Sequence, residues 1–349
     1  MNRIEIKTRA LHFHQTFQIA YESVDETTIV FLKISEGKYF GLGNACPDTE
    51  VTKETPAGVE RILRKKLNNS FFDRPIDQWY YYHEKIQKVF AGWPSAQAAI
   101  EEAILNLFCQ KNNISLTNIF GGYRQNAETM ITIGIKNDVA TIAEIKKRTA
   151  EGFKIIKIKC GLNLSDDLKR VKAAAKTINK NQKIVLDANQ GYTLPQAEKF
   201  IKSIKKFNIA LLEQPVAAKN LKGMKKLNDL KIIPIIADES VITTQDALNL
   251  LLGNYVSGVN IKLAKCGGPI NFIKIFNLAK SLNKIIMLGC MYESNISMTT
   301  GAALASALPI DYVDLDSGHL DFFDDPTKGG AQVKNGKIYI PQPLLSINL

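Results

Sequence analysis

The chain has 349 residues, 45% of them apolar, and a formal net charge of +11. This size and apolar content predict one large domain with a smaller one attached, and no run of eighteen apolar residues indicates a transmembrane helix. The lysines are spread over helix-like segments and no stretch interleaves arginine with aromatic residues, which argues against nucleic-acid binding.

The first third of the chain predicts an α+β unit, in which strands come first and helices follow. A turn at Glu36-Gly37 joins two of the strands into a hairpin, and the last helix begins at Pro94, a residue that suits a first helical turn. We assign residues 1–125 to this capping domain, and the C-terminal segment from about 321 to 349 is a candidate to return to it. The predicted strands and helices are, in chain order, Arg3–His14, Thr28–Ile34, Lys38–Gly43, Glu54–Leu67, Pro75–Phe90 and Pro94–Asn113.

From about Glu128 onward, eight short β-branched runs alternate with segments of helical period. Such alternation predicts parallel βαβ units, and eight units of this size predict a TIM-like barrel over residues 126–320. An open doubly wound sheet is less favoured, because no glycine-rich dinucleotide fingerprint follows any of the strands. Charged residues mark five of the runs at intervals of 28, 26, 25 and 24 residues, namely Lys159, Asp187, Glu213, Asp238 and Lys262.

Three successive strands end in a carboxylate, in the motifs LDAN, LLEQP and IADES. The C-terminal ends of barrel strands converge on one face, so Asp187, Glu213 and Asp238 are expected to lie close together. Three neighbouring carboxylates repel one another, and a hard divalent cation with oxygen ligands relieves that repulsion. The sequence therefore predicts a Mg²⁺ site with open positions for an anionic substrate.

Lysines flank the carboxylates in the order of the strands. Lys157 and Lys159 share one face of the preceding strand, because side chains alternate along a strand, and Lys262 ends the strand that follows. Buried lysine is rare without a partner or a task. Around a closed barrel the lysines lie on opposite sides of the metal, where a pair of ammonium groups serves acid–base catalysis if burial and the cation lower their pKa.

The order KIK, LDAN, LLEQP, IADES and NIKLAKCGG resembles the muconate-lactonising-enzyme subgroup of the enolase superfamily, over nearly the whole chain. The resemblance implies a (β/α)7β barrel beneath an α+β cap and one Mg²⁺ per subunit. It implies that Lys159 and Lys262 are the acid–base catalysts and that Lys157 holds the substrate carboxylate and the developing enolate. Lys265 is a weaker candidate, since it is expected to have left the strand end. The implied metal ligands are Asp187, Glu213 and Asp238.

The last barrel strand, DYVDLDS, carries the feature that separates reactions within this subgroup. Asp314 and Asp316 share a face, and dipeptide epimerases are similar here, with an Asp-x-Asp pair that grips the α-ammonium group of the dipeptide. The segment GCMYES also resembles them, and Thr132 is a further candidate to contact the substrate. The resemblance implies inversion at the α-carbon of the C-terminal residue of L-Ala-Xaa dipeptides by 1,1-proton transfer through an enediolate.

The identity of Xaa depends on the cap loop FQIAYESV, which covers the substrate in this fold. The loop offers Tyr21 and Glu22 and no Arg or Lys between Gln15 and Ile29, whereas relatives that act on L-Ala-D/L-Glu can place a cation there. Neutral or mixed side chains stay open, and so does L-Ala-D/L-Glu from murein peptides. The alternatives are a cycloisomerase, an o-succinylbenzoate synthase or an N-acylamino acid racemase of the same subgroup, and last a non-catalytic basic binding protein.

Five cysteines are scattered along the chain without a CxxC pair, which predicts a reducing compartment. The first residues lack the apolar core of a signal peptide. We therefore expect a cytoplasmic homo-oligomer whose partner is a small dipeptide, with neither a nucleic acid nor a membrane as a partner.

Overall fold

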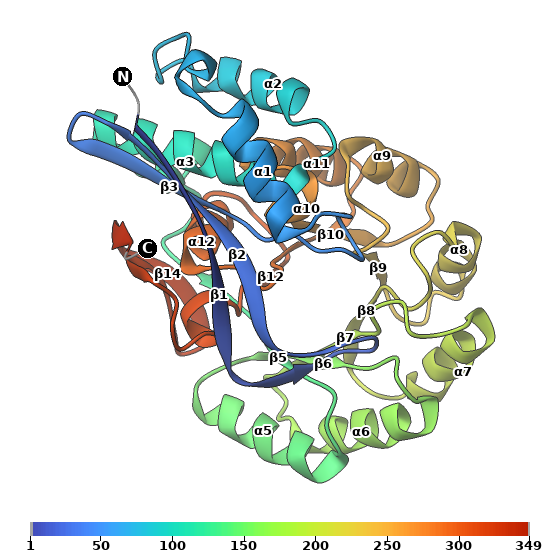
Figure 1. Cartoon of the computed structure of the whole chain (residues 1–349). Coiled ribbons are helices and arrows are strands. Elements are labelled where there is room, and N and C mark those ends of the chain that lie inside the picture. Colours follow the sequence, from blue (N-terminus) through green and yellow to red (C-terminus); the bar gives the residue numbers. More distant parts are fainter. Residues whose placement is uncertain (1–2, 348–349) are drawn as a thin grey trace.

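The computed structural model describes residues 3–347, and Figure 1 shows a cap of strands and helices set against a barrel. The cap sheet is antiparallel in the order β1-β2-β3. Glycines in β3 let the backbone of α3 come close, since a Cβ at Gly41 would lie 1.8 Å from the carbonyl oxygen of Ala103. The elements of the cap are β1 (Arg3–Gln18), β2 (Ser23–Glu36), β3 (Tyr39–Ala45), α1 (Pro56–Lys66), η1 (Asn69–Phe71), α2 (Trp79–Val89), α3 (Pro94–Asn112) and α4 (Leu116–Phe120).

The first hairpin is longer than the sequence pattern predicts. After an irregularity between His12 and Phe17, the strands pair again up to Gln18 and Ser23. The backbone N–H of Ile135 in the barrel donates to the carbonyl oxygen of Gln18 at 2.8 Å. The extension therefore brings the hairpin tip, residues 19–22, to the rim of the barrel.

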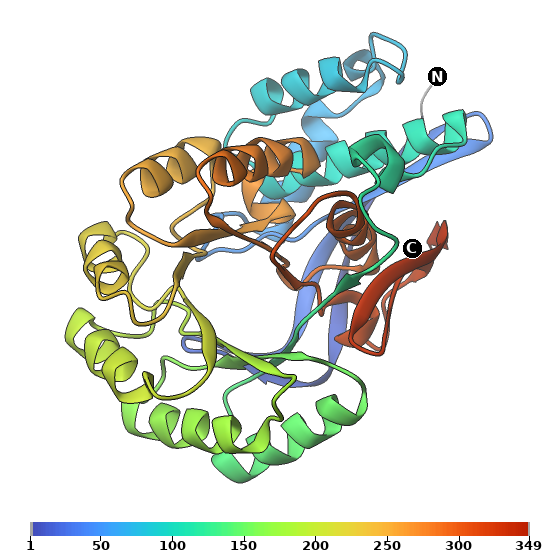
Figure 2. The same cartoon turned by 180° about the vertical axis from the view of Figure 1, so that it is seen from behind.

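Eight parallel strands form the second sheet, in the uninterrupted order β12-β11-β10-β9-β8-β7-β6-β5. Its two ends meet through the backbone N–H of Met130, which donates to the carbonyl oxygen of Val313 at 2.8 Å. The sheet is thus nearly closed into a barrel, which Figure 2 shows from behind. Its strands are β5 (Ile131–Ile133), β6 (Ile155–Lys159), β7 (Lys183–Asp187), β8 (Ile209–Glu213), β9 (Ile235–Ala237), β10 (Gly258–Lys262), β11 (Ile285–Gly289) and β12 (Tyr312–Asp314).

Each barrel strand except the last is followed by a helix, so the predicted (β/α)7β barrel with an α+β cap is confirmed. Two kinds of sequence signal mark the N-terminal ends of three of these helices. Pro lies at the start of α7 and α11, and Thr243 and Asp246 form a capping box on α9. The helices are α5 (Asp138–Ala150), α6 (Leu164–Thr177), α7 (Leu194–Ile204), α8 (Leu221–Asp229), α9 (Thr244–Leu252), α10 (Leu263–Cys266), α11 (Pro269–Ser281) and α12 (Asn295–Ala307).

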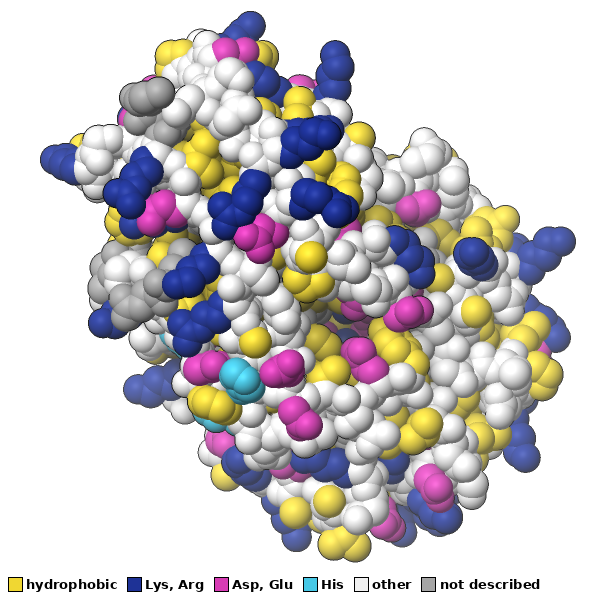
Figure 3. Space-filling view, in the orientation of Figure 1, with side chains coloured by type: hydrophobic (Ala, Val, Ile, Leu, Met, Phe, Trp, Pro, Cys, Tyr) yellow, Lys and Arg dark blue, Asp and Glu magenta, His cyan; other side chains and the backbone are white. Residues whose placement is uncertain are grey.

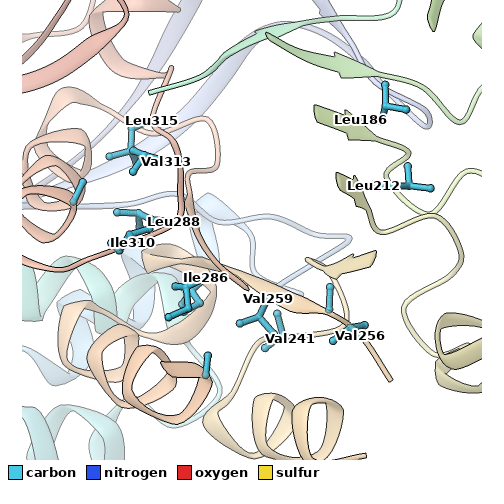
Figure 4. Close-up of a cluster of buried hydrophobic side chains, with 14 of the residues drawn as sticks. Leu186, Leu212, Val241, Val256, Val259, Ile286, Leu288, Ile310, Val313 and Leu315 are labelled. Atoms are coloured by element: carbon cyan, nitrogen blue, oxygen red, sulfur yellow. The ribbon is translucent and has the colours of Figure 1, made fainter. Parts of the chain in front are cut away.

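Alternation along the strands sorts the barrel side chains into an outer and an inner set. Leu186, Leu212 and Val259 belong to the large buried cluster outside the strands, part of which Figure 4 shows. Residues one position away, such as Val185 and Leu211, belong to a separate apolar cluster inside the barrel. This inner cluster fills the barrel below the strand ends, so the next inward positions form the floor of a site.

A third sheet lies beside the barrel, formed by β13 (Thr327–Lys334), β14 (Lys337–Ile347) and β4 (Ala127–Glu128). The short helix η2 (Gly318–Leu320) precedes it, and Phe322 bridges to Phe13 of the cap strand β1. The C-terminal segment thus touches both the barrel and the cap, and the domain boundaries at 125 and 320 stay a prediction. Within residues 3–347 no helix is long and apolar enough to cross a membrane.

Candidate active site

The predicted carboxylates come together at the C-terminal ends of neighbouring strands. Asp187 ends β7 and Glu213 ends β8, and the two are direct partners in the parallel register. Asp238 follows β9 by one residue, held there by Gln214, whose Oε1 accepts from the backbone N–H of Asp238 at 2.9 Å. All three are buried. They form an acidic floor directly above the inner apolar cluster.

Lys157 lies in the middle of this floor. Its Nζ is 3.0 Å from Asp187 Oδ2, 2.8 Å from Glu213 Oε2 and 2.7 Å from Asp314 Oδ2. Burial by itself lowers the pKa of Lys157, but the charges of Asp187, Asp314 and Glu213 outweigh it and raise that pKa well above its ordinary value. Lys157 is thus held as a fixed cation.

Lys159 and Lys262 stand at the two sides of the floor. Lys159 Nζ donates to Asp187 Oδ2 at 2.8 Å and to Asn189 Oδ1 at 2.9 Å. Lys262 Nζ lies 2.9 Å from Asp238 Oδ2. The two lysines therefore contact the outer two carboxylates, with Glu213 between them in strand order. Their ammonium groups face the pocket from β6 and β10.

The pKa of Lys262 differs from the expectation for a catalytic base. Burial lowers it, but Asp238 and Glu213 outweigh burial and raise it well above the ordinary value for lysine. Carboxylates that share their charge with a divalent cation hold an ammonium group less firmly. A base at this position therefore depends on how much of the negative charge of the floor a metal takes up.

Lys265 does not leave the strand end as expected. The one-turn helix α10 begins directly after Lys262, and its turn brings Lys265 back beneath that residue. Lys265 is buried, pairs with Asp238 Oδ1, and donates to the backbone oxygen of Asp238 at 2.5 Å. The spacing of three residues in KLAK is a helical spacing and could have indicated this.

The last strand supplies the pair of acids next to β5. Asp316 Oδ2 accepts from the backbone N–H of Thr132 at 2.6 Å, and Thr132 Oγ1 donates to Asp314 Oδ1 at 3.4 Å. Burial, followed by the charge of Asp314, raises the pKa of Asp316. The structure thus brings Thr132, Asp314 and Asp316 together, and Lys157 links them to the floor.

As the side chains lie, no three His, Cys, Asp or Glu residues within 3–347 form a group that could hold a metal ion. The reason is local, since Asp187 and Asp238 each turn oxygens towards two lysines. Glu213 still fits a cation. Its Oε1 accepts from Asn260 Nδ2 at 2.6 Å, and its buried Oε2 faces the ammonium group of Lys157 at 2.8 Å, so this oxygen already lies against a positive charge. Burial, and then the charge of Asp187, raise the pKa of Glu213 to about 8, so a cation beside this carboxylate would stabilise its ionised form.

The cap closes the site from above. Loop residues Tyr21 and Glu22 line the same cavity as Asp238 of the floor and the two lysines beside it, and Glu22 Oε1 accepts from the hydroxyl of Tyr292 at 3.3 Å. The sequence reasoning missed several lining residues. Asn189 and Glu239 lie within the motifs LDAN and IADES but were not assigned a role, whereas Asp48 comes from a second cap loop that carries no motif. The missed lining residues are Asp48, Val51, Asn189, Glu239 and Asp321, and the segments FQIAYESV and GCMYES, named without these residues, supply Phe17, Ile19, Cys290, Met291 and Tyr292.

Comparisons with known proteins agree with this geometry. Residues 3–121 match the mandelate racemase / muconate lactonizing enzyme N-terminal domain, and residues 140–344 match the enolase C-terminal domain-like family. An L-Ala-D/L-Glu epimerase from Clostridium acetobutylicum is 33% identical over 336 residues, covering 95% of this chain and 94% of that protein.

Two further similarities involve Enterococcus faecalis. A hydrophobic dipeptide epimerase from this organism is 32% identical, covering 91% of this chain and 90% of the relative. The solved structure of a dipeptide epimerase from Enterococcus faecalis V583, complexed with Mg and L-Leu-L-Tyr, has a TM-score of 0.90 and 30% identity. It covers 98% of this chain and 97% of that chain.

Proposed function

Because this chain belongs to the mandelate racemase / muconate lactonizing enzyme family of the enolase superfamily, we propose that it is a Mg²⁺-dependent dipeptide epimerase. The resemblance read from the strand-end motifs is thereby confirmed, and the chain is an isomerase. The proposed reaction inverts the α-carbon of the C-terminal residue of L-Ala-Xaa dipeptides. The supporting relatives differ in the side chains that their names specify, so they leave Xaa open.

The observation that carries the proposal is the placement of lysines around the acidic floor. In this proposal Lys157 binds the substrate carboxylate as a fixed cation, next to the metal ligands Asp187, Glu213 and Asp238. A divalent cation there supplies Lewis-acid stabilisation of the negative charge that develops on this carboxylate. Lys159 and Lys262 then face opposite sides of the reacting carbon.

Inversion follows from these positions. One lysine removes the α-proton from its side, and the opposite lysine returns a proton to the other side of the planar enediolate. For the opposite configuration the two lysines exchange roles. Asn189 orients Lys159 through its side-chain oxygen at 2.9 Å, so that the Nζ keeps its direction between cycles.

Asp314 and Asp316 favour a dipeptide over the other substrates of the subgroup. A buried pair of carboxylates stabilises a cation and repels an anion, and an α-ammonium group meets that requirement. Cycloisomerase or N-acylamino acid racemase substrates carry no free amino group. A free ammonium group should therefore be essential for this enzyme.

Incubation with a dipeptide library and Mg²⁺ in D₂O, read by mass, tests the proposal. We expect α-deuterium in the C-terminal residue of at least one L-Ala-Xaa series. Absence of α-deuterium from every dipeptide would rule out the proposal, and exchange confined to N-acylated amino acids would favour the racemase alternative.

We also propose a cellular compartment, a metal stoichiometry and an oligomeric state. All five cysteines are free, which supports a reducing, cytoplasmic compartment, and we retain one Mg²⁺ per subunit and a homo-oligomer as proposals.

A further inference from the structure

The wall of the cavity opposite the floor is acidic. The cap supplies six of the cavity-lining residues, and both of the charged ones, Glu22 and Asp48, are acids. They come from different loops, the hairpin tip and the segment after β3. Figure 3 shows acidic side chains around the hollow on this face of the molecule. The wall is therefore built by two independent parts of the cap.

Neither acid is neutralised within residues 3–347. Glu22 accepts one long hydrogen bond, from Tyr292, and forms no ion pair there. Asp48 uses Oδ1 to accept from the backbone N–H groups of Glu50 at 2.8 Å and Val51 at 2.6 Å, which fixes the loop without bringing a cation. Burial, and then the charge of Asp48, raise the pKa of Glu22. The two carboxylates therefore repel each other across the wall.

The lysines that line the cavity already pair with carboxylates outside the cap. Each of the four lies within 3.0 Å of a floor or β12 carboxylate, and all are buried. An acidic side chain of the substrate would therefore face Glu22 and Asp48 with no cation left to balance it. A cationic side chain would instead relieve the repulsion between them. These lysines are Lys157, Lys159, Lys262 and Lys265.

The stereochemistry of the proposed reaction directs one substituent of the reacting carbon to this wall. In the planar enediolate, Lys159 and Lys262 lie above and below the plane, the carboxylate points to the floor, and the peptide nitrogen points to Asp314 and Asp316. The remaining in-plane substituent is the side chain of Xaa. It points towards the cap for both configurations.

We propose that Glu22 and Asp48 select dipeptides whose C-terminal residue carries a cationic side chain of the lysine or arginine type. The inference rests on the proposed epimerase function and specifies its substrate class. A charge-assisted hydrogen bond to Glu22 provides the recognition, and Asp48 adds a second favourable charge.

The test compares kcat/KM for L-Ala-L-Lys, L-Ala-L-Gln and L-Ala-L-Glu, three side chains that differ in charge. We expect L-Ala-L-Lys to exceed L-Ala-L-Gln by about 10-fold or more, and L-Ala-L-Glu to be the poorest substrate. Glu22→Gln should lower kcat/KM for L-Ala-L-Lys by about 10-fold, and Glu22→Lys should shift the preference towards L-Ala-L-Glu. Glu26→Gln is the matched control, because Glu26 lies just after the hairpin tip, in β2 and outside the cavity, and its substitution should leave all three values unchanged.

The ranking obtained with the unmodified protein needs no variant and decides the matter by itself. A preference for the neutral or acidic dipeptide would overturn the inference while the epimerase function stands. A higher kcat/KM for L-Lys-L-Ala than for L-Ala-L-Lys would place the cation at the other end of the substrate and would also overturn it. Exchange in no dipeptide at all would contradict both the inference and the proposed function.

Discussion

Asp316→Asn should separate recognition of the substrate ammonium group from the rest of the chemistry. Asparagine keeps a side-chain oxygen that can accept from the backbone N–H of Thr132, the 2.6 Å hydrogen bond that holds Asp316 in place. The substitution removes one negative charge beside Asp314. Burial and the charge of Asp314 raise the pKa of Asp316, so the ionised form of Asp316 is unfavourable in the folded protein. The variant should therefore fold at least as stably as the unmodified protein.

The expected loss follows from the interaction that is weakened. A hydrogen bond to a charged group contributes about 1.5–3 kcal/mol, which corresponds to a decrease in kcat/KM of about 10- to 150-fold. The assay measures kcat/KM for a dipeptide that the enzyme epimerises and for its N-acetylated form. The variant should lose kcat/KM for the dipeptide with a free amine, and its kcat/KM values for the free and the N-acetylated dipeptide should lie closer together than those of the unmodified protein. An equal loss for both substrates, or no loss, would refute the assignment of Asp316 to the ammonium group.

Three other predictions concern the metal, the pH dependence of stability and the backbone near the site. Mg²⁺ should raise the melting temperature, since a ligand at 100 times its Kd stabilises by about 2.7 kcal/mol, and Glu213→Gln should abolish most of this shift in a thermal melt. Glu54 is buried at the start of α3, where both of its oxygens accept from the backbone N–H of Ser95, and burial raises its pKa from 4.5 to about 7. The folded state therefore binds this proton more tightly than the unfolded state does, so stability should fall between about pH 4.5 and 7 as pH rises. In Glu54→Gln, up to about 3 kcal/mol of this decrease in the free energy of unfolding should disappear. A pH profile of denaturant unfolding equal to that of the unmodified protein would contradict the reasoning. Gly161 has φ +102°, and a Cβ added there would lie 2.3 Å from the carbonyl oxygen of Ala188, just after β7. Gly161→Ala should therefore lower the free energy of unfolding by about 1–3 kcal/mol. A melting temperature equal to that of the unmodified protein would refute this.

The barrel and its floor could be predicted because both depend on repeated local signals. Strand runs at intervals of 24 to 28 residues indicate βαβ units, and a charge at the end of such a run marks the face where the strand ends converge. Asp187, Glu213 and Asp238 could be found for this reason. Their exact partners could not, because the contacts of Lys157 with three carboxylates depend on the closure of the barrel between β5 and β12.

The cap side of the site was less accessible to prediction. The hairpin reaches Gln18 and Ser23 across an irregularity that interrupts the alternation of the strand pattern, so the sequence predicted a shorter strand. Asp48 follows β3 in a loop without a motif, and its position over the cavity depends on how the cap sits on the barrel. The position of Lys265 was not predicted for a different reason, because a single helical turn after β10 brings its side chain back to Asp238.

The most direct test of the two-lysine account measures deuterium incorporation and configuration together, for both epimers of one substrate in D₂O. The unmodified enzyme should incorporate α-deuterium and invert the carbon. Lys159→Ala and Lys262→Ala should each lose inversion, by about 100-fold or more, and each should retain exchange from only one configuration, opposite for the two variants. A variant that still inverts at the unmodified rate, or two variants that retain exchange from the same configuration, would contradict the placement of the lysines on opposite sides of the reacting carbon.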